Sequence, residues 1–248
     1  MIKNISIVII ASNAEHTICE TLDSLKSFEE VIVYENNSTD NTKNLVKNYK
    51  NVKLINGDFI GFGPTKNKAS TYAKNDWILS LDSDEVLNQD LVEELSNIDL
   101  KDEKNVFLLK RDNYFLGKEV KYSGWGRDFL IRVYNKKKYK FNDNKVHEFI
   151  DIDNSSNVKK LKNSFKHNAV TNLNQFLYKI ARYSDLASDG KRTCFFMIVI
   201  LKSSYAFFKT YIFQLGFLDG WRGFFIAISN GMGKFYRYTK RYVNCKER

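Results

Sequence analysis

The stretch that decides the fold is Trp77-Ile78-Leu79-Ser80-Leu81-Asp82-Ser83-Asp84-Glu85, an apolar run that ends in three carboxylates. A buried strand that ends in clustered acids places them at the sheet edge where α/β folds bind ligands. Carboxylates this close repel one another unless a cation lies among them, and hard oxygen donors suit Mg²⁺ or Mn²⁺. The stretch therefore predicts a metal-bound diphosphate. The alternative is a solvated acidic turn that caps a helix starting near Asp90.

The residues before this stretch alternate between short apolar strands and amphipathic helical segments. This alternation predicts a parallel sheet covered by helices, and so an α/β class. Asn13 is expected to cap the first helix, and Ser38, Thr39 or Asp40 the second. A Gly/Pro loop then leads into a third helix and offers a site for an anionic group. The expected strands are Ile5–Ile10, Val31–Tyr34, Val52–Ile55 and Trp77–Leu81.

The pattern changes twice further along the chain. After a helix over Asp90–Ile98, strands are expected at Val106–Leu109 and Asp128–Tyr134, which would continue the first sheet as a mixed sheet. From about residue 165 the pattern becomes long, aromatic and helical. We therefore expect a catalytic domain over residues 1–165, with halves 1–100 and 101–165, and a helical, basic region over residues 166–248.

Charge is divided unevenly between these parts. The net charge of +10 combines 9 Lys/Arg against 16 Asp/Glu in residues 1–100 with 30 against 13 in the remainder. With 43% hydrophobic residues the chain can bury a large core and is not disordered. The apolar run Cys194–Leu201 is shorter than the roughly 20 residues that a membrane span needs. Three widely spaced cysteines predict free thiols in a reducing compartment.

Four segments in order resemble the nucleotide-sugar half of family 2 glycosyltransferases: Ile7–Glu15, Val31–Thr42, Lys66-Asn67 with Ala69, and Asp76–Glu85. Later segments resemble the bacterial lipopolysaccharide-core β-1,4-glucosyltransferases and their relatives: Gly124-Trp125, Asp128, Arg132–Tyr134, Val146–Glu148 and Gly216–Trp221. The resemblance implies a GT-A fold, a nucleotide-diphosphate sugar donor, a divalent metal and inversion at the anomeric carbon.

The resemblance also implies residue roles in the donor site. Asp84 would be the direct metal ligand, helped by Asp82 near the ribose. Three roles are possible for Glu85: a metal ligand, a side chain that holds the metal ligands from behind, or a residue at the start of the next helix. Glu35 stands where the family has an Asp that contacts uracil or ribose, so UDP-hexose is the expected donor with an altered base contact. The residues expected against the nucleotide are Ala11, Ser12, Asn13, Glu15, Glu35, Asn37, Lys66, Asp82 and Ser83.

An inverting transfer also needs a base that takes the proton of the acceptor hydroxyl. Two acids qualify, Glu148 and Asp128, of which Glu148 is preferred. His147 would orient Glu148, or it would contact the diphosphate or the metal. Pairing with Arg127 or Arg132 is the structural alternative for either acid.

The C-terminal region combines aromatic residues with an excess of Lys and Arg. Residues 159–248 hold 17 Lys/Arg against 4 Asp/Glu. Aromatic helices with basic flanks suit the headgroup region of an anionic membrane, although packing on the catalytic domain or on a second subunit explains them equally. We expect a cytoplasmic enzyme, peripheral at the inner membrane, with a lipid-linked or core-oligosaccharide acceptor. Competing hypotheses are another glycan acceptor, a nucleic-acid-binding protein, which the acidic front disfavours, and a catalytically dead relative.

Overall fold

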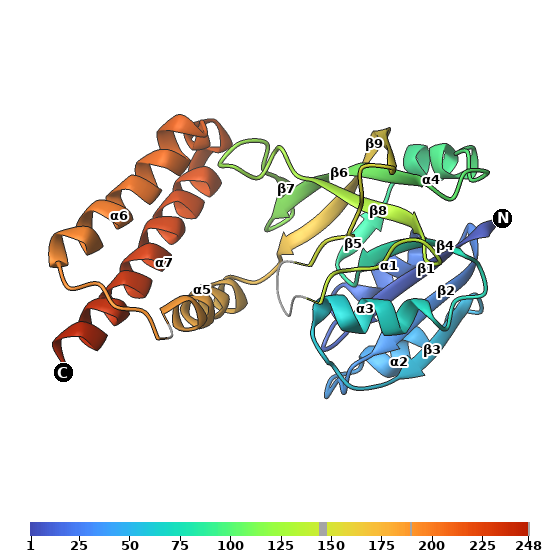
Figure 1. The fold of residues 1–248 in the computed structure, drawn as a ribbon, viewed down its shortest axis with the longest axis horizontal. Helices are drawn as coiled ribbons and strands as arrows, with labels where there is room; N and C mark the ends of the chain where they lie inside the picture. Colours follow the sequence, from blue (N-terminus) through green and yellow to red (C-terminus); the bar gives the residue numbers. More distant parts are fainter. Residues whose placement is uncertain (144–147, 189, 248) are drawn as a thin grey trace. The chain divides into compact units, whose positions relative to one another are not determined.

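The computed structural model describes residues 1–143, 148–188 and 190–247 (Figure 1). The chain forms two compact units. The first comprises residues 1–111 and 128–167, and the second comprises residues 112–127 and the chain from residue 168. The sequence predicted a catalytic domain that ends at residue 165 and a separate helical, basic region after it. This assignment of functions to the two parts of the chain stays a prediction.

A nine-stranded sheet in the order β3-β2-β1-β4-β8-β6-β9-β5 forms the framework, with β7 paired to β6. Neighbours among β3, β2, β1 and β4 are parallel, and β8 is antiparallel to β4. The predicted α/β class with a mixed sheet is confirmed. The elements are β1 (Ile2–Ala11), α1 (Ile18–Asp23), β2 (Phe28–Glu35), α2 (Thr42–Val46), β3 (Val52–Asn56), α3 (Phe62–Ser70), β4 (Trp77–Asp82), β5 (Glu85–Leu87), α4 (Gln89–Ser96), β6 (Asn105–Phe115), β7 (Lys118–Glu119), β8 (Phe129–Asn135) and β9 (Asn157–Val170).

Two hydrophobic layers hold this sheet, one on each face. Successive side chains of a strand point to opposite faces, so Ile7 and Ile9 of β1 join one layer while Val8 joins the other. The first layer also contains buried residues of α1, α2 and α4, and the second contains Ala69 of α3. Because both faces are covered, the central strands β1 and β4 are mostly apolar on both sides, as in parallel sheets generally.

The first predicted helix cap is wrong. Helix α1 begins at Ile18, and the cap position is Thr17. Asn13 lies four residues before this cap position. Asn13 has a φ of +50°, and its Oδ1 accepts a hydrogen bond from the Thr39 N–H at 2.8 Å. The Asn13 side chain therefore joins two loops instead of capping a helix.

The second unit contains α5 (Leu173–Ser188), α6 (Phe196–Phe208), η1 (Lys209–Phe213), η2 (Gly216–Asp219) and α7 (Gly220–Lys246). The predicted C-terminal helical region is confirmed. Helix α6 packs along α7, where a Cβ on Gly231 would lie 3.3 Å from the Ser203 carbonyl oxygen. Glycine therefore permits the close approach of the two helices at this point.

The cysteine prediction is wrong for two of the three residues. Cys194, before α6, and Cys245, in the last turn of α7, form a disulfide with Cα atoms 5.4 Å apart. Only Cys19 is a free thiol among the described residues. The cysteines therefore no longer indicate a reducing compartment.

The C-terminal apolar segment is longer than the sequence run suggested. Helix α6 continues into η1, and together Phe196–Phe213 form an 18-residue segment that is long and apolar enough to cross a membrane by length and composition. Within the part of the chain that the structure describes, no other helix meets these criteria.

Candidate active site

The three carboxylates of the deciding stretch separate at a tight turn between β4 and β5. Strand β4 ends at Asp82 and β5 begins at Glu85. The Asp82 N–H donates to Glu85 Oε2 at 2.9 Å, which closes the turn. The side chains of Asp82 and Asp84 are about one-third exposed, at 33% and 30%, whereas Glu85 is fully buried. The turn therefore gives each acid a different environment.

Glu85 lies behind the site and holds two arginines. Its Oε1 pairs with Arg132 and, at 3.3 Å, with Arg111. Burial raises the pKa of the Glu85 carboxyl above its ordinary value, although the charge of Arg132 opposes the rise. The helix-start role is wrong, because α4 begins at Gln89 and is capped by Asn88, whose Oδ1 accepts the Leu91 N–H. Of the three roles considered for Glu85, this geometry supports the one in which its side chain holds the metal ligands from behind.

Both oxygens of Asp82 are engaged by cations. Oδ1 lies 2.8 Å from Lys66 Nζ, and Oδ2 lies 3.0 Å from Arg132 Nη2. Burial raises the pKa of Asp82, but the charges of Lys66 and Arg132 outweigh burial and bring this pKa well below its usual range. Asp82 is therefore ionised and fixed in position.

The two base candidates lie at the ends of one continuous chain of ion pairs. Lys66, which is itself buried, joins Asp82 to Glu148 Oε1 at 2.8 Å. At the other end, Arg111 contacts Asp128 Oδ2 at 2.8 Å through Nη2. In order, the chain runs Glu148, Lys66, Asp82, Arg132, Glu85, Arg111 and Asp128. His147 lies outside the described residues.

Asp84 has a different partner, which the sequence reasoning missed. Its Oδ2 lies 3.6 Å from His167 Nε2. His167 reaches this position because β9 pairs with β5, with His167 opposite Glu85. Nothing in the sequence predicted β9 as a strand, since its buried residues, Leu161, Phe165 and Val170, are four and five positions apart. This spacing lacks the alternation at every second residue that marks half-buried strands.

The residues around the turn fit a divalent cation. The ion-pair chain and Asp84 contain five carboxylates against three Lys/Arg, which leaves a formal excess of two negative charges. No cluster of three or more His, Cys, Asp or Glu side chains arranged to hold a metal occurs in the described ranges. One carboxylate and one imidazole leave the remaining positions to phosphate oxygens and water, as Mg²⁺ sites commonly do. Asp84 and His167 are therefore the residues suited to hold a metal here.

The loops that follow β1 and β2 are joined at the same edge of the sheet. The Ser12 hydroxyl donates to the Asn36 carbonyl at 3.0 Å, and Glu15 Oε2 accepts the Asn41 N–H at 3.0 Å. Asn13 and Asn37 both have a left-handed backbone, with φ of +50° and +52°. Non-glycine residues in this region concentrate at ligand-binding sites, although Asn tolerates it better than most.

The remaining residues expected against the nucleotide are less accessible. Glu35 is fully buried, where its carboxylate accepts the Ser38 N–H and lies 3.0 Å from Lys43 Nζ. Burial raises the pKa of Glu35, but these contacts bring it below the ordinary value. Ala11 is buried, and the carbonyl of Ser83 accepts a hydrogen bond from the Thr21 hydroxyl at 3.1 Å. The roles of all three at the nucleotide stay predictions.

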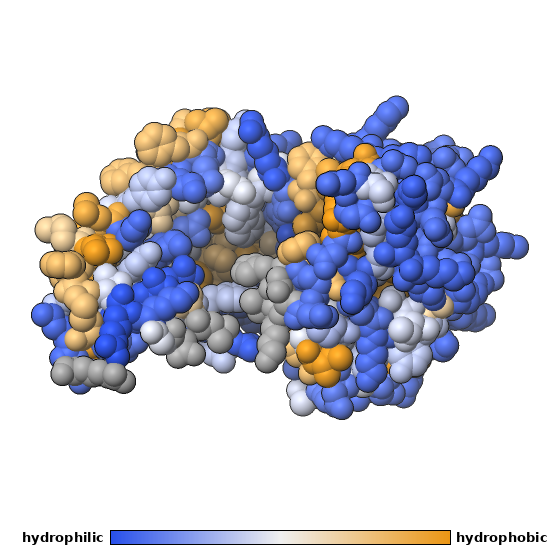
Figure 2. All heavy atoms as spheres, viewed as in Figure 1, coloured by the Kyte–Doolittle hydropathy of each residue, from blue (hydrophilic) through white to orange (hydrophobic). Residues whose placement is uncertain are grey.

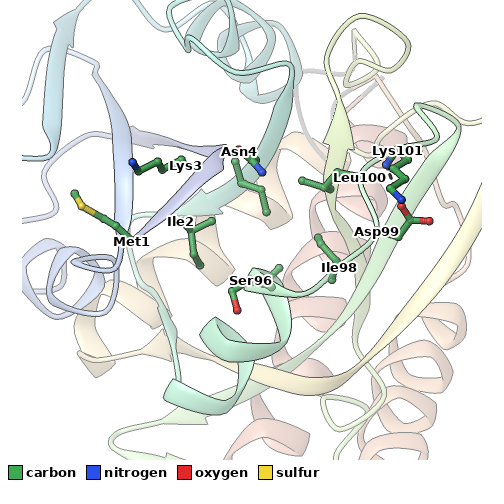
Figure 3. A pocket seen from close by; sticks show the side chains of 11 residues that line it. Met1, Ile2, Lys3, Asn4, Ser96, Ile98, Asp99, Leu100 and Lys101 are labelled. Atoms are coloured by element: carbon green, nitrogen blue, oxygen red, sulfur yellow. Dashed lines mark hydrogen bonds between the residues drawn. The ribbon is translucent and has the colours of Figure 1, made fainter.

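The protein also has an open pocket of about 840 Å³ in the first unit, away from the acids (Figure 3). It is lined by residues 1–5, at the start of β1, and by the end of α4 with the segment Ile98–Lys101 that follows. Because β1 and β4 are parallel, this pocket lies at the amino ends of the strands. Ligands of such sheets bind at the carboxyl ends, so the candidate site remains the acid-bearing turn.

Comparison with known proteins places this geometry in a family. The model of glycosyl transferase family 2 matches residues 6–165. An uncharacterized glycosyltransferase of Rickettsia typhi is 28% identical and covers 99% of this chain and 89% of its own length. The lipopolysaccharide core biosynthesis glycosyltransferase LpsC of Rhizobium meliloti is 24% identical over 96% of this chain and 92% of its own. A crystal structure of S. aureus TarS with UDP-GlcNAc is similar with a TM-score of 0.48 and 15% identity, covering 94% of this chain and 81% of that one.

The matched region contains the acid-bearing turn, both base candidates and the joined loops, and the expected transferase class is confirmed. The chain belongs to glycosyl transferase family 2.

Proposed function

We propose that this glycosyltransferase is metal-dependent and inverting, and that it moves a hexose from UDP to a lipopolysaccharide or lipooligosaccharide core sugar. The observation that carries the proposal is the separation of roles among the three acids. Asp82 and Glu85 are held by Lys and Arg side chains, whereas Asp84 faces His167. This division supports Asp84 as the ligand of a cation that the other two acids help to position.

Departure of the nucleoside diphosphate is the costly event of such a transfer. A bound Mg²⁺ or Mn²⁺ would neutralise the charge that builds on the leaving phosphates. The residues of the chain hold the donor in position. Arg132 fixes Asp82 beside the donor, and the exposed loops that contain Asn13 and Asn37 would lie against the nucleoside.

Glu148 is the proposed base. The acceptor oxygen attacks the anomeric carbon, its proton passes to the Glu148 carboxylate, and the bond from the anomeric carbon to the diphosphate oxygen breaks. The contact of Lys66 with both Glu148 and Asp82 fixes the base relative to the donor acid. Asp128 is held in the same way by Arg111 at the other end of the ion-pair chain and is the alternative base.

The acceptor is the least constrained part of the proposal. The relative LpsC has lipopolysaccharide core biosynthesis in its name and matches nearly the whole chain, which supports a core sugar acceptor. Such an acceptor is lipid-linked, and we therefore propose that the enzyme works as a peripheral protein at the cytoplasmic face of the inner membrane. If the enzyme acts only on capsule, exopolysaccharide or glycoprotein glycans, the proposal of a core sugar acceptor is wrong.

The first experiment measures thermal stabilisation by nucleoside diphosphates and their sugars with Mn²⁺, Mg²⁺ or chelator. We expect metal-dependent stabilisation by UDP and one UDP-hexose, and its loss in Asp84→Ala. Asp99→Ala, which removes an exposed acid far from the turn, is the matched control and should respond as the wild type does. Unchanged metal dependence in Asp84→Ala would refute the ligand assignment, and stabilisation without turnover on any acceptor would indicate a catalytically dead relative.

A second experiment separates the base candidates. Glu148→Gln should lower turnover by roughly a hundredfold or more while donor binding persists, because proton transfer and not binding is lost. Asp128→Asn should retain most of the activity. If Asp128→Asn is the inactive variant, the assignment of the base must be reversed.

A further inference from the structure

Helix α6 is exposed on its apolar side. Met197, Leu201 and Tyr205, spaced four residues apart along one face, have exposed fractions of 61%, 60% and 59%. Phe196, Ile200 and Phe208 are exposed on the same side, while Val199 is buried. A helix packed on a soluble protein normally turns its apolar side inward. In Phe196–Phe213 only 17% of the residues are buried.

The apolar surface continues beyond α6. Exposed large side chains follow in η1, η2 and the first turns of α7, including Phe213 at 76% and Trp221 at 56%. Figure 2 shows hydrophobic residues gathered over the α6 side of the helical unit. We call this surface, from Phe195 to Phe224, the apolar face. Contiguous apolar patches of this extent mark interaction surfaces.

A group of cations lies beside the apolar face. Burial lowers the pKa of the Lys234 ammonium, and the charges of Arg237, Arg241, Lys209 and Lys202 lower it further. The other four cations, from α6, η1 and α7, are therefore close enough to Lys234 to repel its ammonium group. Arg241 also donates through Nη2 to the Ala187 carbonyl. A concentration of cations beside an apolar surface favours anionic groups as neighbours.

We infer that the apolar face docks on an anionic lipid bilayer, with α6 lying in the plane of the interface and the five cations at the level of the lipid phosphates. The inference rests on the proposed function, since a lipid-linked acceptor is what makes docking useful. The charge beside the apolar face is the argument for lipid over a protein partner: a bilayer offers acyl chains and phosphates side by side.

An orientation in the plane follows from the contacts of α6. Lys202 and Lys209 are seven residues apart, two turns of a helix, and so lie on one flank of the segment. The buried side of α6, which includes Val199, packs along α7, whose last turns contain Lys240, Arg241 and Lys246. Crossing the bilayer would take these charges into hydrocarbon, whereas an interfacial position leaves them among phosphates.

Vesicle binding of the full-length protein tests the inference without donor, metal or acceptor. We expect the wild type to sediment with vesicles of phosphatidylglycerol and not with vesicles of phosphatidylcholine alone. Ile200→Asp with Leu201→Asp should weaken binding at least about tenfold, because two inserted apolar side chains are replaced by charges. Lys202→Gln and Lys209→Gln should each weaken it about fivefold, from about 1 kcal/mol for each cation near an anionic surface.

Two controls in the first unit match these changes. Ile152→Asp alters an exposed isoleucine, and Lys26→Gln removes an exposed cation, so neither should change vesicle binding. Circular dichroism verifies that the α6 variants remain folded. No binding of the wild type to anionic vesicles, or equal binding by the α6 variants, overturns the inference. A stable dimer lost in Ile200→Asp with Leu201→Asp, with vesicle binding unchanged, overturns it in favour of a second copy.

The same preparations separate this inference from the proposed function. Asp84→Ala should lose metal-dependent stabilisation by UDP yet bind anionic vesicles as the wild type does. The α6 variants should keep that stabilisation by UDP. If vesicle binding is confirmed while no nucleotide stabilises the protein, the docking face stands and the proposed function fails.

Discussion

Replacing Arg132 with Met should destabilise the first unit strongly. Arg132 is buried and pairs with both Asp82 and Glu85, and its guanidinium lies 5.7 Å from the centre of the Phe165 ring. Met fills similar space but leaves the fully buried Glu85 with Arg111 alone, at 3.3 Å. Breaking a buried ion pair by removing one partner costs about 3–5 kcal/mol. In a protein of this size, that loss lowers the melting temperature by about 6–20 °C.

Calorimetry and urea unfolding measure this loss, and two further variants identify its cause. Arg111→Met removes a cation that is 21% exposed, so water can replace its contacts and the loss should be clearly smaller. Adding Glu85→Gln to Arg132→Met should recover part of the stability, because the buried negative charge left behind is removed. The reasoning is refuted if Arg132→Met costs no more than Arg111→Met, or if Glu85→Gln recovers nothing.

Four further outcomes are expected. Lys66→Met frees Glu148 and should lower kcat by about tenfold to a hundredfold with donor affinity retained, measured by steady-state kinetics. His167→Ala should weaken Mn²⁺ affinity roughly tenfold or more, measured by metal titration of UDP-dependent stabilisation, while the exposed control His16→Ala should not. Folding lowers the pKa of Asp82, so its ionised carboxylate stabilises the fold above about pH 4, and this stabilisation is lost as the pH falls below that value. In Asp82→Asn the free energy of unfolding should therefore depend less steeply on pH, measured by acid unfolding. Cys194→Ser opens a loop of 51 residues and should cost the second unit at most about 4 kcal/mol, measured by urea unfolding with and without reductant.

The sequence predicted the strands whose side chains are buried, because burial imposes a pattern. Strand β4 and its terminal acids were found from an apolar run, and the structure places them at the predicted edge. Strand β9 was missed because its buried residues do not alternate along the strand, and His167 was missed with it. The resemblance implied different roles for Asp82 and Asp84, but the contacts that hold Asp82 and Glu85 could not be predicted, since they depend on Arg111 in β6 and Arg132 in β8.

The ion-pair chain also bears on how the donor binds. Lys66 was expected near the phosphates, yet its Nζ already contacts Asp82 and Glu148 at 2.8 Å each. A phosphate that drew Lys66 away would leave two carboxylates without their shared cation. The arrangement therefore favours a donor whose diphosphate is neutralised at Asp84, so that Lys66 remains between Asp82 and the proposed base. Lys66 would then fix the base without contacting the donor, which is why its replacement should lower kcat and leave donor affinity unchanged.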